Sequence, residues 1–136
     1  MTIHSNTEPK TIDLDRISPG TGRLRICTGI TQVTMTDPDG TTRQEWQYEE
    51  ECIEIPAAGI PDIGLLRAAR NILIARVDGL CLRYNEQVTL VASGQLTATA
   101  MTTANYAALL TYKQALRDIT KNFTTLAAIS WPEIPK

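Results

Sequence analysis

The chain has 136 residues, 43% of them hydrophobic, and a formal net charge of -2. This length suits one domain with a small appendage and allows a real core, and the acidic balance argues against nucleic acid as a partner. The cysteines Cys27, Cys52 and Cys81 are widely spaced and the single histidine is His4, so the sequence lacks the regular ligand spacing of a zinc site. We therefore expect no metal and no cofactor.

Membrane association is not expected either. No apolar run reaches the roughly 18 residues of a membrane span, and no apolar segment of a secretory signal follows Met1. The sequence thus predicts no membrane partner and a protein that acts in the cytoplasm with free thiols.

Residues 1 to 10 are polar and without periodicity, which predicts a flexible N-terminus. Residues 11 to 56 are rich in β-branched residues and predict about three antiparallel strands. The run Asp37-Pro38-Asp39-Gly40 is typical of a turn. It predicts a hairpin in which Thr31–Thr36 pairs with roughly Thr41–Trp46.

The second arm of this hairpin changes phase along its length. Trp46 and Tyr48 occupy even positions, whereas Ile53 and Ile55 occupy odd ones. Since a shift of one residue exchanges the two faces of a strand, we expect a bulge or a bend near Glu49–Glu51.

Residues 57 to 136 form the predicted helical region. A Pro-rich linker leads into a long helix from about Asp62 to at least Tyr84. Its expected buried stripe has helical spacing and comprises Ile63, Leu66, Ala69, Leu73, Val77, Leu80 and Tyr84. Residues 88 to 103 favour neither state, except for a break at Ser93-Gly94.

A second helix is predicted from about Ala104 to Lys121, with Thr102 or Thr103 as its N-cap. The turn between the helices favours an antiparallel pair. The predicted fold class is α+β: an N-terminal antiparallel sheet with a hairpin, then a long helix and an antiparallel second helix.

Two groups of charged residues are candidate sites. Glu49 and Glu51 share one strand face and could hold a cation, but no His or Asp accompanies them, so a charged edge strand or a partner surface is favoured. Arg76 is one of several arginines along the first helix, which suit either an acidic partner or a solvated face. Phosphate-binding loops and catalytic triads are absent from the sequence, so no catalytic residue is predicted.

The run Tyr112-Lys113-Gln114-Ala115-Leu116-Arg117-Asp118-Ile119 ends an amphipathic helix, and Trp131-Pro132 and Pro135 follow it. Together they resemble the C-terminal signature of the phage tail assembly chaperone family, tail-fibre assembly proteins of tailed bacteriophages and prophages. Lys113 departs from the more usual Arg, and Thr120 to Ser130 replace the usual Pro/Gly-rich turn. Leu65 to Asp78 resembles the preceding helix of that family, so the resemblance covers the C-terminal half.

The resemblance implies a non-catalytic protein that binds a phage tail or tail-fibre polypeptide during virion assembly in the host cytoplasm. Trp131 together with Tyr106, Tyr112 and Phe123 forms either an exposed aromatic anchor for that partner or a small aromatic core that fastens the C-terminal tail. The predicted partner-binding residues are Trp131, Tyr112, Arg117, Glu49, Glu51 and Arg76. Three alternatives stay open: a structural component retained in the tail, an enzyme of unrecognised type, and self-association into a homo-oligomer.

Overall fold

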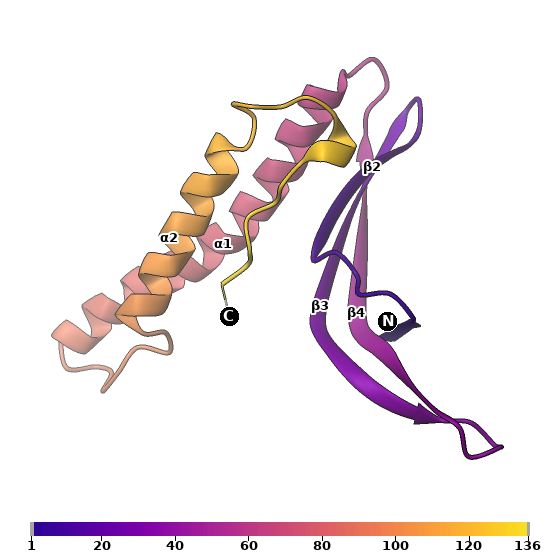
Figure 1. Cartoon of the computed structure of the whole chain (residues 1–136). Helices are drawn as coiled ribbons and strands as arrows, with labels where there is room; N and C mark the ends of the chain where they lie inside the picture. Colours follow the sequence, from indigo (N-terminus) through magenta and orange to yellow (C-terminus); the bar gives the residue numbers. More distant parts are fainter. Residues whose placement is uncertain (1, 136) are drawn as a thin grey trace. The chain divides into compact units, whose positions relative to one another are not determined.

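A computed structural model describes residues 2–135 of the chain, which has an N-terminal antiparallel sheet followed by two helices (Figure 1). The predicted α+β class is confirmed. The chain divides into two compact units, residues 1–60 and residues 61–136, called the sheet unit and the helical unit below. Among the described residues, no helix is long and apolar enough to cross a membrane.

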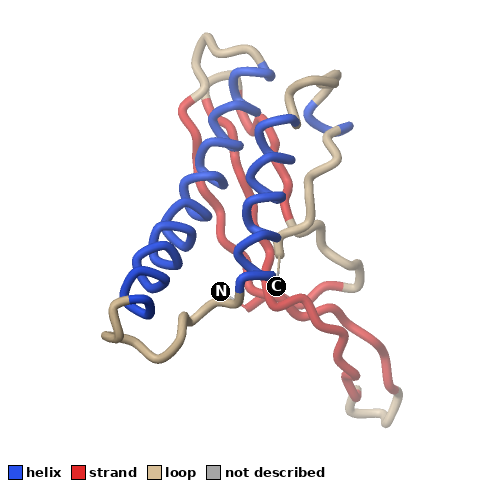
Figure 2. The backbone as a smooth tube through the Cα atoms, turned by 90° about the vertical axis from the view of Figure 1, so that its left-hand side faces the viewer, coloured by secondary structure: helices blue, strands red, loops and turns tan. Residues whose placement is uncertain are grey.

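The sheet unit contains one four-stranded sheet in the order β1-β4-β3-β2, with every neighbouring pair antiparallel. Its strands are β1 (Thr2–Ser5), β2 (Ile12–Ser18), β3 (Thr21–Thr36) and β4 (Thr42–Pro56). The two long strands β3 and β4 form its centre and continue as a hairpin (Figure 2).

The hairpin turn lies where the sequence predicts it. Thr36 pairs with Thr42 and Thr31 with Gln47, one residue away from the expected register. The Asp37 amide donates to the Thr41 carbonyl at 2.8 Å, which closes the loop.

The phase change of β4 has a different origin from the predicted one. The register shifts between Thr28 and Thr31 of β3, where Gly29 and Ile30 together face the single residue Tyr48. A bulge was expected at Glu49–Glu51 of β4, and this position is wrong because the bulge lies in β3. Gly29 has a φ of 61°, a conformation that glycine adopts at little cost and glutamate does not, so the extra residue belongs to β3.

One face of the sheet carries the core of the sheet unit. Ile12 lies opposite Ile26 and Leu14 lies opposite Leu24, and each of these side chains is at most 5% exposed. The alternation of apolar residues with charged ones, which predicted these strands, places the ion pair between Asp13 and Arg25 (2.9 Å) on the other face.

The N-terminal segment contains a strand that the sequence did not predict. Thr2–Ser5 pairs with Trp46–Glu49 of β4. As a result β4 lies inside the sheet next to β1, and its predicted place at the edge is wrong over these residues. A four-residue polar strand has too little pattern to be found without its partner.

Helix α1 runs from Asp62 to Ala92, so the ambiguous segment after Val88 begins as helix. It ends at the predicted break: the Gln95 amide donates to the Leu90 carbonyl (2.9 Å) and the Gly94 amide to the Val91 carbonyl (3.1 Å). Gly94 has a φ of 79°. This is the Schellman arrangement, which needs a left-handed residue after the C-cap.

Helix α2 runs from Thr103 to Asp118, and the side chain of its N-cap, Thr102, accepts a hydrogen bond from the Asn105 amide at 3.1 Å. It ends before the predicted Lys121, because i to i−3 bonds such as Lys121 N–H to the Asp118 carbonyl tighten the chain there. A short 3-10 helix η1, Leu126–Ala128, lies in the C-terminal segment.

The buried stripe of α1 comprises Leu65, Leu66, Ala69, Leu73, Val77, Cys81 and Tyr84. This agrees with the predicted stripe at five of its seven positions, and two corrections are needed. The predicted Ile63 is half-buried, while Leu65, which was not predicted, is fully buried. Leu80 is 48% exposed, while its neighbour Cys81 is buried. Both lie close to the edge of the apolar sector of the helix, so only the position of the neighbouring helix decides which of them is covered.

Candidate functional site

The helical unit presents its apolar surface along an antiparallel pair, with α1 and α2 side by side (Figures 1 and 2). The rings of Tyr84 and Tyr106 stack with centroids 4.3 Å apart. The Tyr84 hydroxyl lies 3.1 Å from the Thr103 hydroxyl. Further along, Lys113 forms an ion pair with Asp78. These contacts set how the two helices are aligned, and therefore which exposed side chains of α1 lie next to which exposed side chains of α2.

The signature helix divides into a buried half and an exposed half. Leu109, Tyr112 and Leu116 are buried, with exposures of 7%, 4% and 0%. Burial raises the pKa of the Tyr112 hydroxyl, since the charged phenolate loses hydration. Tyr112 therefore lies in the core of the helical unit, and Arg117 lies on the surface.

Two exposed leucines emerge on the same side of the helix pair. Leu82 lies one turn after Asp78 on α1, and Leu110 lies one turn before Lys113 on α2. Because the helices run antiparallel and Asp78 and Lys113 meet in an ion pair, Leu82 and Leu110 both lie next to that pair on the side of the loop between the helices. Their exposures are 61% and 42%. Arg117 lies one turn beyond Lys113, at the end of the same row.

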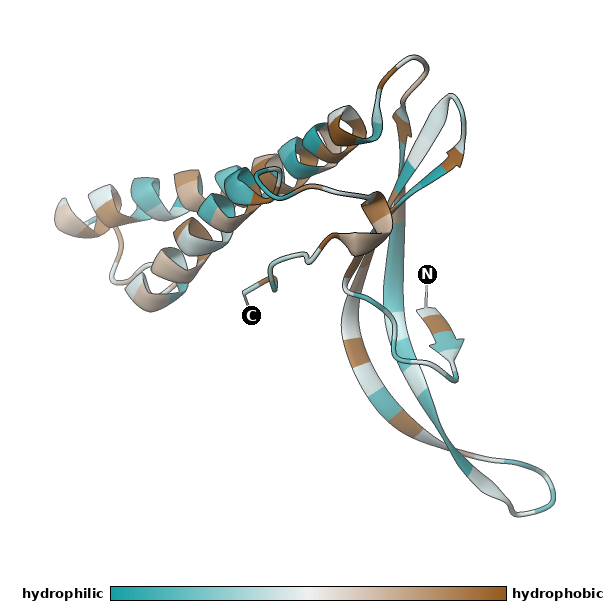
Figure 3. Cartoon of the chain, turned by 45° about the horizontal axis from the view of Figure 1, so that its top comes forward, coloured by the Kyte–Doolittle hydropathy of each residue, from teal (hydrophilic) through white to brown (hydrophobic). Residues whose placement is uncertain are grey.

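We call this surface the helix face and define it by Asp78, Leu82, Leu110, Lys113 and Arg117. Figure 3 shows apolar and polar residues alternating along the outside of both helices. Sequence reasoning missed Leu82 and Leu110 because it looked for the buried stripe. The sequence did contain a signal for this surface: Leu82 and Leu110 are apolar residues that lie outside the predicted buried stripes of their helices.

A pocket of about 260 Å³ lies where α2 ends and the C-terminal segment folds back. Ile119, Phe123 and Ile129 line it together with Asp118 and several hydroxyl groups. Asp118 accepts from Lys121 at 2.9 Å and from Gln114 at 3.1 Å. These hydrogen bonds hold the pKa of Asp118 below its ordinary value, and the bond from Lys121 has the largest effect.

The remaining predicted residues of the helical unit lie apart from this row. Trp131 is half-buried in the C-terminal segment. Tyr106 stacks on Tyr84, which was not in the predicted aromatic group. Arg76 is exposed on α1 one turn before Leu80, and therefore on a different side from Leu82.

Glu49 and Glu51 lie on one face of β4, as their alternation predicts, and both are exposed. The Thr2 hydroxyl donates a hydrogen bond to the Glu49 carboxylate, which lowers the pKa of Glu49. Among residues 2–135, no group of three or more His, Cys, Asp or Glu side chains is placed to hold a metal ion.

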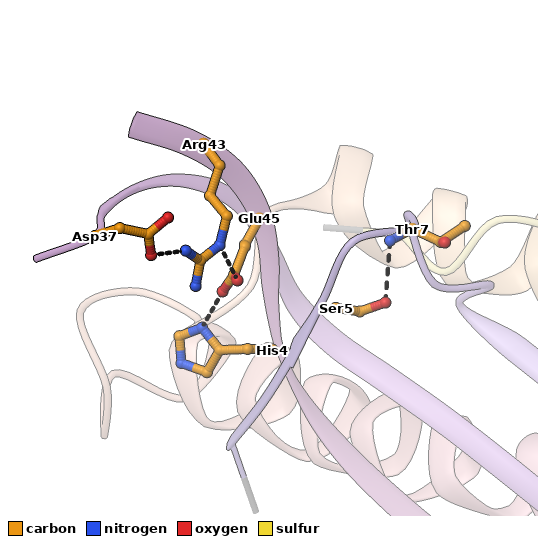
Figure 4. A network of polar contacts seen from close by, with 6 residues as sticks. All are labelled: His4, Ser5, Thr7, Asp37, Arg43 and Glu45. Carbon is orange, nitrogen blue, oxygen red and sulfur yellow. Dashed lines mark hydrogen bonds and ion pairs between the residues drawn. The ribbon is translucent and has the colours of Figure 1, made fainter. Parts of the chain in front are cut away.

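A polar network joins β1 to the hairpin (Figure 4). Glu45 of β4 lies 3.4 Å from the imidazole Nδ1 of His4 and accepts a hydrogen bond from Arg43 Nε at 2.9 Å. Arg43 also pairs with Asp37 at the turn. Since these side chains belong to β1, β4 and the turn, the network fastens β1 to the hairpin.

Leu82 and Leu110 are two of several exposed apolar side chains among the described residues, and they lie beside charged groups on a helix pair that already has its own core. A family model described as phage tail assembly chaperone protein matches residues 64–136. This is more than half of the chain, which therefore belongs to the phage tail assembly chaperone family. The matched segment nearly coincides with the helical unit, which begins at residue 61. Comparison with curated proteins and with solved structures gave no match.

Proposed function

We propose that the chain acts without catalysis and binds a phage tail or tail-fibre polypeptide in the host cytoplasm until that polypeptide assembles. The observation that carries the proposal is the family match over residues 64–136. Because this segment coincides with the helical unit, the surface that binds the partner should lie on that unit.

The helix face supports this role. Leu82 and Leu110 offer apolar surface, and Arg117 offers a cation at one end of the row. A partner helix with apolar side chains at helical spacing and an acidic group near Arg117 would fit such a surface. The gain from covering two exposed leucines is modest. It suits a partner that must later be released.

The other residues that the sequence predicted to bind the partner contribute in different ways. Tyr112 supports the helix face from within the core. The half-buried Trp131 leaves part of its indole available to the partner, while Arg76, Glu49 and Glu51 are exposed and would contribute secondary contacts. We also propose that the chain associates with itself through a surface other than the helix face.

The test is a tagged pull-down from cells that express the phage or prophage tail genes, with mass spectrometry of the soluble pool and of purified particles. We expect a tail or tail-fibre protein to be captured from the soluble pool, and this chain to be missing from particles. Its presence in particles would instead make it a structural component, and capture of no tail protein would refute the proposal.

Matched variants locate the surface. Leu82→Asp and Leu110→Asp place a carboxylate in the row, and we expect each to abolish capture of the tail protein. Leu80→Asp is the control, because Leu80 is on the same helix with 48% exposure but points about 200° away from Leu82. Equal loss of capture in all three variants would show that the helix face is not the binding surface.

A further inference from the structure

Within the described part of the chain, no strand pairs with the outer edge of β3 over its second half. Strand β2 pairs with β3 only from Thr21 to Ile26, and the next residue, Cys27, donates its amide to the Thr11 carbonyl at 2.8 Å. Among residues 2–135, no strand pairs with this side of Thr28–Thr36. The hairpin therefore carries an open backbone edge along the segment from Thr31 to Thr36 (Figure 2).

This edge also lacks the usual protection against strand addition. Proteins protect exposed edges with charged residues, with proline or with a covering strand. The segment from Thr28 to Thr36 contains no charged residue and no proline, and it is rich in β-branched residues. On the opposite edge, β4 carries Arg43 and Glu45 and is then covered by β1. The asymmetry points to the β3 edge as a pairing surface.

We propose that the β3 edge pairs with the same edge of a second copy of this chain. The pairing is antiparallel around a two-fold axis at Val33, so that Val33 faces Val33 of the second copy. Thr31 then faces Met35, and Gln32 faces Thr34. This register joins residues of equal parity, so the side chains of each pair lie on the same face of the extended sheet.

The chemistry of the edge favours a second copy over an unrelated polypeptide. Self-pairing by a two-fold axis usually brings like charges together, and this segment has none to oppose it. Gln32 opposite Thr34 would repeat the amide-to-hydroxyl contact that Gln44 and Thr34 already make at 2.8 Å within the hairpin. One two-fold contact also occupies the open edge of both copies, so the assembly closes as a dimer.

The dimer should be weak. Two edges that meet along a few residues bury less surface than the roughly 1,200–2,000 Å² of a stable interface. Its population should therefore rise with protein concentration. The inference specifies the surface of the proposed self-association. It does not depend on the proposed binding of a tail protein, because it concerns the sheet unit and not the segment that matches the family.

Sedimentation velocity of the purified full chain over a wide concentration series tests the inference. We expect a reversible monomer–dimer equilibrium. Val33→Lys and Val33→Glu each place like charges face to face and should weaken the dimer by about tenfold or more. A mixture of these two variants should dimerise again, because lysine then faces glutamate. Thr42→Lys, on β4 of the same hairpin, is the control and should dimerise like the natural chain.

Hydrogen exchange of the unaltered chain provides a second measurement that does not depend on how the variants fold. Amides between Thr31 and Thr36 should become more protected as concentration rises, and those between Thr42 and Glu45 should not. A chain that stays monomeric over the whole series overturns the inference. So does a dimer that is unaffected by either charge at position 33, since it would use another surface.

Discussion

Replacing Leu116 by alanine tests whether the signature helix contributes to the core as the structure shows. Leu116 is 0% exposed, so Leu116→Ala loses the burial of three carbon groups, about 2.4 kcal/mol at roughly 0.8 kcal/mol each. The cavity that remains adds to this, for a total of about 3–4 kcal/mol. Leu110→Ala makes the same chemical change at a site that is 42% exposed, and it should cost about 1 kcal/mol.

The assay is urea unfolding followed by tryptophan fluorescence. Trp46 lies in the sheet unit and Trp131 in the helical unit. A Trp46→Phe background therefore lets Trp131 report on the helical unit alone. We expect the free energy of unfolding to fall about three times as far for Leu116→Ala as for Leu110→Ala. Equal losses would refute the assignment of Leu116 to the core and of Leu110 to the surface.

Two further predictions concern the ends of the helices. Gly94→Ala should lower the free energy of unfolding of the helical unit by about 1 kcal/mol, since a side chain at a φ of 79° is strained; an unchanged value in urea unfolding would contradict the Schellman end. Asp118→Asn should lower the melting temperature at neutral pH. The folded pKa of Asp118 lies below its ordinary value of 3.8, so its stabilisation is present above that value and is lost as the pH falls through the folded pKa. The difference between Asp118→Asn and the natural chain should therefore vanish in acid, and a difference that persists there would argue against the role of the ionised carboxylate.

Much of the fold could be predicted because its signals are local. The Asp-Pro-Asp-Gly turn set the hairpin to within one residue of the observed register. The period of apolar residues gave both helices and their order. The sequence narrowed the N-cap of α2 to Thr102 or Thr103 and located the Ser93-Gly94 break, because a cap or a stop depends on residues that are close in sequence.

The features that were missed or misplaced depend on pairing between distant residues. Strand β1 exists only because Thr2–Ser5 finds the edge of β4. The bulge could be inferred from the phase of β4, but its position in β3 depends on which strand can supply an extra residue, and Gly29 does so. Leu80 and Cys81 lie about 100° apart on α1, on opposite sides of the line through Val77 and Tyr84, so the sequence alone could not decide which of them is buried.

The sequence by itself determined the fold class, the hairpin turn, the start of each helix, the break after α1 and a C-terminal signature whose family the comparison confirmed. Each of these depends on nearby residues or on a repeated spacing, which the chain carries whether or not it is folded. The tertiary structure alone decided that Tyr112 is buried while Leu82 and Leu110 emerge beside the Asp78–Lys113 ion pair. It also decided that β2 stops pairing with β3 after Ile26, so that no strand of residues 2–135 covers this edge of β3 beyond Cys27. The physical reason is that burial and edge exposure are properties of contacts between elements, and a pattern within one element cannot specify which of its sides its neighbours cover.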